Sequence, residues 1–363
     1  MRQWDAIPPL RGRAKGRARF GRDDVFDMAR RAHSPLACGT RAASLPRGMR
    51  ISTGYSDIPA EAKGAVVAIG NFDGVHPGHR AVLTRANEVA ENLGAPLGVV
   101  TFEPHPRRYF QPAIPPFRLT PPPTKRRLIA EAGATHYYEL PFDAAMAALT
   151  AEAFIERVLL EGLGVRHVVV GAGFAFGKGR TGTVSVLEHV AGHKGGVGVT
   201  VVAPVSASDG ALSSSTRVRE CLARGEPERA AALLGRGFAI EGEVMQGDKR
   251  GRLLGFPTAN LGLDDYLHPA FGVYAVRAVP LGGPGARWSG VANLGIRPTI
   301  GGAKAQLEAH LFDFSGDLYG KTLAVELLSF IRPERKFENL DALKAQIAQD
   351  SARARGILAA HGN

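Results

Sequence analysis

Residues 65–79 of the chain read AVVAIGNFDGVHPGH. The apolar run over residues 65–70 is typical of a strand buried inside a parallel sheet, because it has no polar face. The amphipathic stretch over residues 80–93 predicts a helix directly after the loop. The start of a helix offers free N–H groups and the positive end of the helix dipole, and both attract anions. The sequence therefore predicts an anion-binding turn between this strand and this helix.

Two histidines occupy that turn. His76 and His79 are three positions apart, which places them on one face of the first helical turn. Two imidazoles there can donate hydrogen bonds to phosphate oxygens and stabilise charge that builds up during a reaction. A metal site is not favoured, because no third ligand of matching type is evident in the sequence. We therefore expect these histidines to face a phosphate group.

Beyond this turn, apolar runs alternate with amphipathic stretches as far as residue 205. Strands that alternate with helices indicate a parallel sheet with helices on both faces. The pattern predicts strands over residues 97–102, 136–140, 165–171 and 198–205, and helices over residues 125–132 and 150–160.

The pattern changes after Gly235, where short apolar segments follow one another with Gly and Pro turns and without helices between them. Close spacing of this kind predicts an antiparallel barrel or sandwich. The expected strands cover residues 238–244, 272–279, 288–294, 307–314 and 323–330, and a helix over residues 340–354 closes the chain. Two short helices, over residues 216–222 and 227–234, mark the boundary between the two domains.

The composition fits a folded soluble protein and excludes several other classes. The 363 residues are 45% hydrophobic and 22% charged, and no apolar run approaches the ~20 residues that a membrane helix needs. Cys38 and Cys221 are the two cysteines, which excludes a disulfide scaffold or a cysteine-based zinc module. We therefore expect a cytoplasmic protein with no membrane partner; the oligomeric state cannot be read from the sequence.

The formal charge of +11 is concentrated at the start of the chain, because residues 1–48 hold eleven basic and four acidic side chains. This segment has no hydrophobic period, and we expect it to be disordered. A transit peptide is disfavoured by the four acids, and an RNA-binding arm by the absence of interleaved aromatic residues. We expect residues 1–48 to be an extension ahead of a natural start at Met49, and a nucleic-acid partner to be unlikely.

From Met49 to Gly356 the chain resembles the bacterial bifunctional riboflavin kinase/FMN adenylyltransferase (FAD synthetase) family. The motifs that carry the resemblance are the stretch 70–79, TFEPHP at 101–106, GAGFAFG at 171–177, SSTRVR at 214–219, GFPTAN at 255–260 and EAH at 308–310. The resemblance implies a Rossmann-like α/β nucleotidyltransferase domain over residues 49–225. It also implies a small antiparallel β-barrel kinase domain over residues 236–356, with a C-terminal helix. The implied reactions convert riboflavin and ATP to FMN, and then FMN and ATP to FAD and pyrophosphate, with Mg²⁺.

In the first domain, the resemblance implies that His76 and His79 are catalytic and hold the ATP phosphates. Further residues implied to bind ATP are Asn71, Phe72, Asp73, Gly74, Ser214, Ser215, Thr216 and Arg219. Three hydroxyls at the start of a helix, with an arginine one turn later, suit a phosphate. The flavin and nucleotide loop would use His105, Phe174, Phe176 and Gly177, while Gly173 stands where the family loop has Asp.

In the second domain, Thr258 and Asn260 lie two residues apart on an extended segment, so their oxygens project to the same side. The resemblance assigns them to Mg²⁺, which prefers oxygen ligands. Glu308 and His310 alternate along a strand in the same way, and the resemblance makes Glu308 the general base, on the inward face of that strand. The implied nucleotide-binding residues are Gly247, Gly251, Gly255, Pro257 and Arg297.

Three functions remain open at this point. The leading hypothesis is an enzyme with both activities in sequence. The alternatives are a riboflavin kinase whose adenylyltransferase domain is degenerate, suggested by Gly173, and a nucleotidyltransferase for another phosphorylated acceptor.

Overall fold

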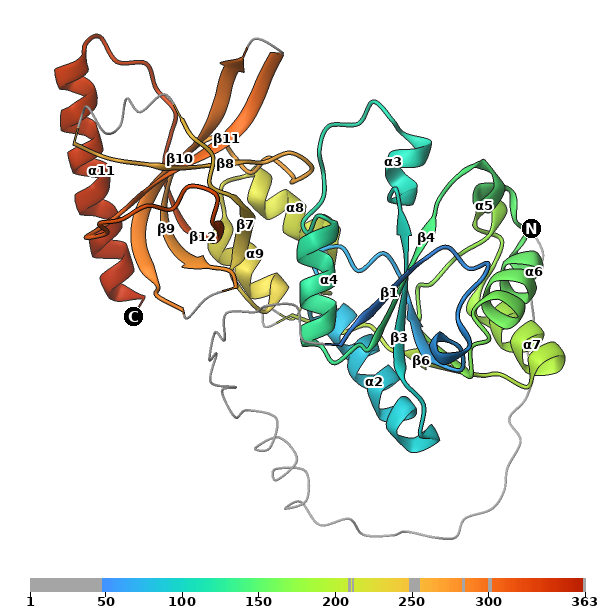
Figure 1. Cartoon of the computed structure of the whole chain (residues 1–363). Coiled ribbons are helices and arrows are strands. Elements are labelled where there is room, and N and C mark those ends of the chain that lie inside the picture. The colour runs from blue at the N-terminus through green and yellow to red at the C-terminus, as the bar shows by residue number, and fades with distance from the viewer. Residues whose placement is uncertain are drawn as a thin grey trace, which may run out of the picture. The chain divides into compact units, whose positions relative to one another are not determined.

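The structure is a computed structural model that describes residues 48–207, 210, 212–247, 255–282, 285–299 and 302–361 (Figure 1). The extension predicted over residues 1–48 lies outside these residues except for Gly48, and Gly251 lies outside them as well. Among the helices that are described, none combines the length and apolar character needed to cross a membrane.

The first domain is built on a six-stranded parallel sheet, as predicted. Its strands lie in the order β1-β4-β3-β2-β5-β6. Their bounds are β1 Arg50–Thr53, β2 Val66–Ile69, β3 Leu97–Glu103, β4 His136–Pro141, β5 His167–Gly171 and β6 Gly198–Val202. The chain runs outward from β2 to β4 on one side and then crosses to β5 on the other. The loop after β2 therefore leaves the carboxyl edge of the sheet where the strand order reverses, which is where such sheets bind ligands.

Helices cover both faces of this sheet, because successive residues of β2 point in opposite directions. Val66 and Ala68 pack with Leu83 of α2 (Pro77–Leu93), whereas Val67 and Ile69 pack in a second core on the other face. The second core is completed by α6 (Ala151–Ala153), a π-helix over Phe154–Gly162, and α7 (Val184–Gly195). The remaining helices of this domain are α3 (Pro106–Phe110), α4 (Pro122–Glu131), α5 (Ala144–Ala148) and the short 3₁₀ turns Ala60–Ala62 and Lys178–Arg180.

The second domain is a six-stranded antiparallel sheet that curls into a nearly closed barrel. Of the barrel and the sandwich that the sequence predicts, the barrel is therefore the one that forms. The order is β7-β12-β9-β10-β11-β8, and the bridge between Met245 and Asn260 brings the two edges together. The strands are β7 Phe238–Glu243, β8 Ala259–Gly262, β9 Gly272–Pro280, β10 Trp288–Thr299, β11 Gly302–Leu311 and β12 Thr322–Pro333. The final helix α11 (Leu340–Ala360) packs on the outside of the barrel, where Ala354 and Leu358 meet Ala275 (Figure 1).

Two helices join the domains and share the barrel's core. In α8 (Ser215–Ala223) and α9 (Pro227–Leu234), Leu222 and Leu233 belong to the same buried cluster as Phe238 and Tyr274. A polar contact adds to this core, because Glu241 of β7 accepts hydrogen bonds from Thr124 and Arg127 of α4. The barrel is therefore attached to the α/β domain through α4 as well as through the chain itself.

Candidate functional site

The loop after β2 is held in an unusual backbone conformation. Phe72 and Val75 both have positive φ, at 48° and 40°. Val75 is β-branched, and this region is strongly disfavoured for such residues, so the surroundings must impose the conformation. Strain of this kind is concentrated at functional sites.

The side chain of Asp73 holds this loop in place. It is 4% exposed, and its carboxylate accepts hydrogen bonds from the backbone N–H groups of Leu119 and Thr120, each at 2.9 Å. The Arg219 guanidinium donates to the same carboxylate and to the carbonyl of Phe117. The resemblance implies that Asp73 and Arg219 bind ATP phosphates. In the structure they bind each other, so both act on the loop that carries the histidines.

The histidines lie together at the start of α2. His76 is the N-cap, and its Nδ1 accepts a hydrogen bond from the N–H of His79 at 3.4 Å. The two rings stack with centroids 3.7 Å apart, and Phe72 packs edge-on against His79. Because Nδ1 of His76 accepts, its proton lies on Nε2, which can donate to a ligand. The Nδ1 atom of His79 is buried without a hydrogen-bond partner among the described residues.

Burial keeps both rings neutral. It lowers the pKa of His76 to about 4, against the opposing effect of Asp73, and it lowers the pKa of His79 well below 6.5. The charges of Arg219 and Arg236 lower both pKa values further, and the charge of Lys125 lowers that of His79. A neutral imidazole keeps one N–H, with which each ring can donate a hydrogen bond to an anion at this helix start.

The serine-threonine run begins α8, as predicted, but its hydroxyls have separate roles. Ser214 is the N-cap and accepts from the N–H of Arg217 at 3.3 Å. Ser215 Oγ donates to the backbone carbonyl of Asp73 at 2.7 Å. Thr216 is exposed and makes no hydrogen bond through its hydroxyl to any other residue that the structure describes. Two of the three hydroxyls therefore support the helix start and the loop, and Thr216 is available to a ligand. Asn71 and Gly74 lie in the same loop, where the Gly74 N–H donates to Thr120.

The loop after β5, residues 172–177, carries two aromatic side chains. Phe174 and Phe176 stack with centroids 5.2 Å apart. Gly177 has φ of 72°, and a side chain there would meet the backbone of Ala151 at 2.8 Å, so only glycine fits. His105 caps α3, its Nδ1 accepting from the N–H of Arg107 at 3.0 Å, and burial lowers its pKa to about 4. Gly173 is bordered by open space, because no described atom lies within 4 Å of the point where a Cβ would stand.

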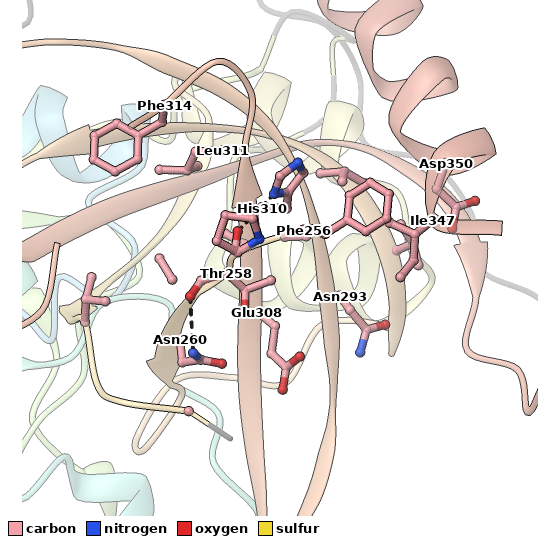
Figure 2. Close-up of a pocket in the computed structure, with 18 of the residues that line it drawn as sticks. Phe256, Thr258, Asn260, Asn293, Glu308, His310, Leu311, Phe314, Ile347 and Asp350 are labelled. Atoms are coloured by element: carbon pink, nitrogen blue, oxygen red, sulfur yellow. Dashed lines mark hydrogen bonds between the residues drawn. The ribbon is translucent and has the colours of Figure 1, made fainter. Parts of the chain in front are cut away.

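The barrel carries a cavity of about 1290 Å³, lined by outward-facing strand residues, by α11 and by the segment 314–319, and bordered by the core residues Ala309 and Leu311. Figure 2 shows part of its lining. Three side chains form a row across adjacent strands, because Glu308 of β11 lies directly opposite Asn260 of β8 on one side and Asn293 of β10 on the other. His310, two residues along, forms a hydrogen bond between its Nδ1 and the carbonyl of Pro257 at 2.9 Å. Glu308 and His310 thus share a face, as predicted.

That face is not the inward one. Leu307, Ala309 and Leu311 fill the barrel core, so Glu308 and His310 point outward into the cavity. The expectation of an inward carboxylate is wrong because a barrel this small is filled by apolar side chains, and a ligand must bind outside it. The outer face is covered by α11, which explains why it is not simply solvated.

Further residues predicted for this site lie around the same cavity. A side chain at Gly247 would meet the Asn260 amide at 2.5 Å, so glycine lets the chain approach that residue closely. Gly247, Pro257, Thr258 and Arg297 line the cavity, and Gly255 directly precedes its lining residue Phe256. Arg297 donates to Gln306 at 3.4 Å.

The donor set fits a magnesium ion held together with phosphate. Asn260 is 4% exposed and its amide nitrogen donates to the carbonyl of Thr258, with the amide oxygen on the side of Glu308 (Figure 2). The oxygens of Thr258 and Asn260 are hard donors. In the described part of the chain, no group of three or more His, Cys, Asp or Glu side chains is arranged to hold a metal alone. Mg²⁺ that keeps waters and phosphate oxygens needs few protein ligands.

The fold and these two sites define a two-domain transferase that handles phosphorylated nucleotides. The FAD synthetase family model matches residues 58–216, and the riboflavin kinase model matches residues 234–358. The chain belongs to the family of bifunctional riboflavin kinase/FMN adenylyltransferases.

Relatives with that name match along most of their length. The one from Pseudomonas fluorescens is 43% identical over 86% of this chain and 98% of its own. Those from Escherichia coli K12 and Bacillus subtilis are 44% and 38% identical, each over 82% of this chain and 93% of its own. A solved structure from Streptococcus pneumoniae, titled a macrolide-efflux protein, shares the fold with a TM-score of 0.73 and 31% identity, over 84% of this chain and 98% of that one.

Proposed function

We propose that the barrel transfers the γ-phosphoryl group of ATP to riboflavin, and that the α/β domain transfers the AMP moiety of a second ATP to the resulting FMN. The products are FMN and ADP in the first reaction, and FAD and pyrophosphate in the second. The observation that carries this proposal is the row of Asn260, Glu308 and Asn293 in a cavity large enough for a flavin.

In the barrel, Glu308 is the general base. Its carboxylate accepts the proton of the ribityl hydroxyl as the hydroxyl oxygen forms a bond to the γ-phosphorus and the bond to ADP breaks. Thr258 and Asn260 would hold Mg²⁺, which neutralises phosphate charge when bound. The N–H groups around Gly247 and Gly255, with Arg297, bind the phosphates. His310 is held by the Pro257 carbonyl and keeps the Thr258 segment against β11.

In the α/β domain, a phosphate oxygen of FMN attacks the α-phosphorus of ATP, and pyrophosphate leaves. The attacking phosphate is already ionised, so no general base is required, and the protein acts by positioning and by offsetting charge. Neutral His76 and His79 donate to phosphate oxygens. Thr216 contributes a hydroxyl, while Asp73, Arg219, Ser214 and Ser215 keep the loop and the helix start in position.

The flavin lies against Phe174 and Phe176 in this proposal, with His105 and Gly177 shaping the loop. We propose the domain limits 49–225 and 236–356 for the two activities. We further propose that the protein works in the cytoplasm on small molecules, without a membrane or nucleic-acid partner. The buried free thiol of Cys221 is consistent with a reducing compartment.

The test is a product assay with riboflavin, ATP and Mg²⁺, repeated with a chelator and on a chain that starts at Met49. We expect FMN and then FAD, and neither when Mg²⁺ is removed. His79→Ala should abolish FAD but spare FMN, and Glu308→Ala should abolish FMN but leave supplied FMN convertible. Loss of both activities in either variant would contradict separate sites.

Gly173, which stands where the family loop has Asp, suggests a second candidate, a kinase whose adenylyltransferase domain is degenerate. That candidate predicts that FMN accumulates and that no FAD forms from supplied FMN.

A further inference from the structure

Lys125, on α4, is a buried cation. Its side chain is among the largest fully buried ones, with the residue only 2% exposed. Its ammonium group makes no hydrogen bond and no ion pair with any residue of the described ranges. The ammonium nitrogen is not among the fully buried atoms that lack a partner, so it keeps a small contact with solvent through which a ligand can reach it. A lysine packed in this way without a protein counterion suits an anionic ligand.

The carboxylates near Lys125 are already occupied. Glu103, Asp73 and Glu139 lie close enough to act on its charge. Both Glu103 oxygens accept from Arg118, and Arg126 donates to both oxygens of Glu139. Asp73 is held by Arg219 and two backbone N–H groups. Each of the three carboxylates is therefore paired with an arginine. The charge of Lys125 is not balanced by any of them, so these seven side chains together carry a net charge of +1.

The excess charge lies at the site described after β2. The charge of Lys125 lowers the pKa of both His79, in the first turn of α2, and His105, just after β3. His79 also has a buried Nδ1 that finds no partner in the described ranges. The backbone N–H groups of Leu119 and Thr120, just ahead of α4, donate to Asp73, so the start of α4 lies against the loop that carries the histidines. An ammonium without a counterion at that place lacks a partner that an anionic ligand would supply.

We propose that Lys125 is a phosphate-binding residue of the adenylyl-transfer site, contacting a phosphate group of the bound nucleotide, and this rests on the proposed function. An ammonium group has three donors and a compact charge, which suits a phosphate oxygen. The phosphate belongs either to FMN or to ATP, and the two sources are separated by measuring the KM of each.

The experiment compares Lys125→Met, Lys125→Arg and a control, Lys194→Met, in the full chain. Lys194 lies on α7 and forms an exposed ion pair with Glu156. We expect Lys125→Met to raise the KM for FMN or for ATP in FAD formation about 10- to 100-fold, and Lys125→Arg to recover most of the loss. The control should leave FAD formation unchanged, and all three should phosphorylate riboflavin at the normal rate.

Thermal unfolding distinguishes ligand binding from a structural role. Because Lys125 has no partner to lose among the described residues, Lys125→Met should leave the unfolding temperature unchanged or raise it. Inorganic pyrophosphate should raise the unfolding temperature of the unsubstituted protein and raise that of Lys125→Met less. An unchanged KM for both substrates, or a fall in unfolding temperature together with loss of the kinase activity, would overturn the proposal. If the unsubstituted protein forms no FAD, the proposed adenylyl transfer fails, and an equal pyrophosphate shift in both proteins would still overturn the role of Lys125.

Discussion

Arg219 of α8 and Asp73 of the loop after β2 form a buried ion pair across 146 positions of sequence. The pair fixes the loop that carries the two histidines to the helix that begins with Ser214. Removing the arginine leaves the Asp73 carboxylate buried with only backbone donors, which typically costs about 3–5 kcal/mol of unfolding free energy. The two residues are therefore expected to matter for stability as well as for adenylyl transfer.

We predict that Arg219→Met lowers the thermal unfolding midpoint and abolishes FAD formation, because the loop loses its support. The matched control is Arg217→Met two residues earlier, where the side chain donates to the carbonyl of Leu212. That variant should change the midpoint much less. If Arg219→Met unfolds like the unsubstituted protein and loses only affinity for ATP, the arginine binds phosphate directly and the assigned positioning role is wrong.

The local patterns around these residues are predictable from the sequence, but their pairing is not. The apolar run of β2 and the histidine spacing are local signals, and both lead to the observed strand, turn and helix. Asp73 and Arg219 meet through tertiary packing, which no local pattern encodes. Lys125 looks like an ordinary residue at the start of a helix, because burial of a lysine depends on what the rest of the chain places around it.

Several helices and strands have other bounds than the sequence predicts, because contacts with neighbouring elements help to decide where they begin and end. The helix expected over residues 150–160 is largely a π-helix over Phe154–Gly162, and the strand expected to reach residue 205 ends at Val202. α4 begins at Pro122 rather than Lys125, since proline fits the first turn of a helix. The four-residue strands β1 and β8 are too short for an alternation pattern, and they form because a neighbouring strand pairs with them.

The two asparagines beside Glu308 provide a test of the magnesium site. Asn260→Ala removes a proposed ligand, so the Mg²⁺ concentration for half-maximal FMN formation should rise roughly 10-fold, a loss typical of one oxygen donor. Asn293→Ala is the matched control on the other side of Glu308, where the amide donates to Glu334 at 3.2 Å. We expect that variant to leave the Mg²⁺ dependence unchanged. Equal Mg²⁺ curves for both variants would contradict the assignment of Asn260.

The buried histidines predict a particular acid sensitivity. The pKa values of His76 and His105 are lowered from 6.5 to about 4 in the folded protein, mainly by burial. Between these values the unfolded chain binds protons that the folded protein does not, so stability is complete above about pH 6.5 and is lost as the pH falls towards 4. Each shift corresponds to about 3 kcal/mol at most.

We therefore expect the unfolding temperature to fall between pH 6.5 and pH 5, before most carboxylates titrate. Replacing both histidines by asparagine keeps an N-cap at each position and should weaken this dependence, while His79, whose pKa is also lowered by burial, accounts for part of what remains. His189→Asn, at an exposed position of α7, should leave it unchanged. A dependence as steep in the double variant as in the unsubstituted protein would contradict the role of His76 and His105.

The contact between α4 and the barrel should stabilise the protein more than an exposed ion pair does. Glu241 of β7 accepts from Arg127 and from Thr124 Oγ1 at 3.1 Å, and its side chain is 9% exposed. Glu241→Gln removes one charged partner of Arg127, which keeps its ion pair with Glu131, so we expect a loss of about 2 kcal/mol of unfolding free energy. Glu88→Gln breaks the exposed pair with Arg85 and should cost under ~1 kcal/mol. Similar losses in denaturant unfolding would mean that the contact contributes no more than a surface pair.

Gly173 allows a direct test of the adenylyltransferase loop. The position where a Cβ would lie has no described neighbour within 4 Å, and the φ of this glycine is not in the left-handed region, so Gly173→Asp should fold normally. An aspartate beside Phe174 would supply a hydrogen-bond acceptor for the hydroxyl or N–H groups of the flavin nucleotide. We predict that the KM for FMN falls in FAD formation while the kinase activity is unchanged.

Gly173→Ala is the control, because it alters the backbone entropy in the same way without adding a carboxylate. If both variants change the KM equally, the effect comes from the backbone, and the family's aspartate contact has no counterpart in this loop.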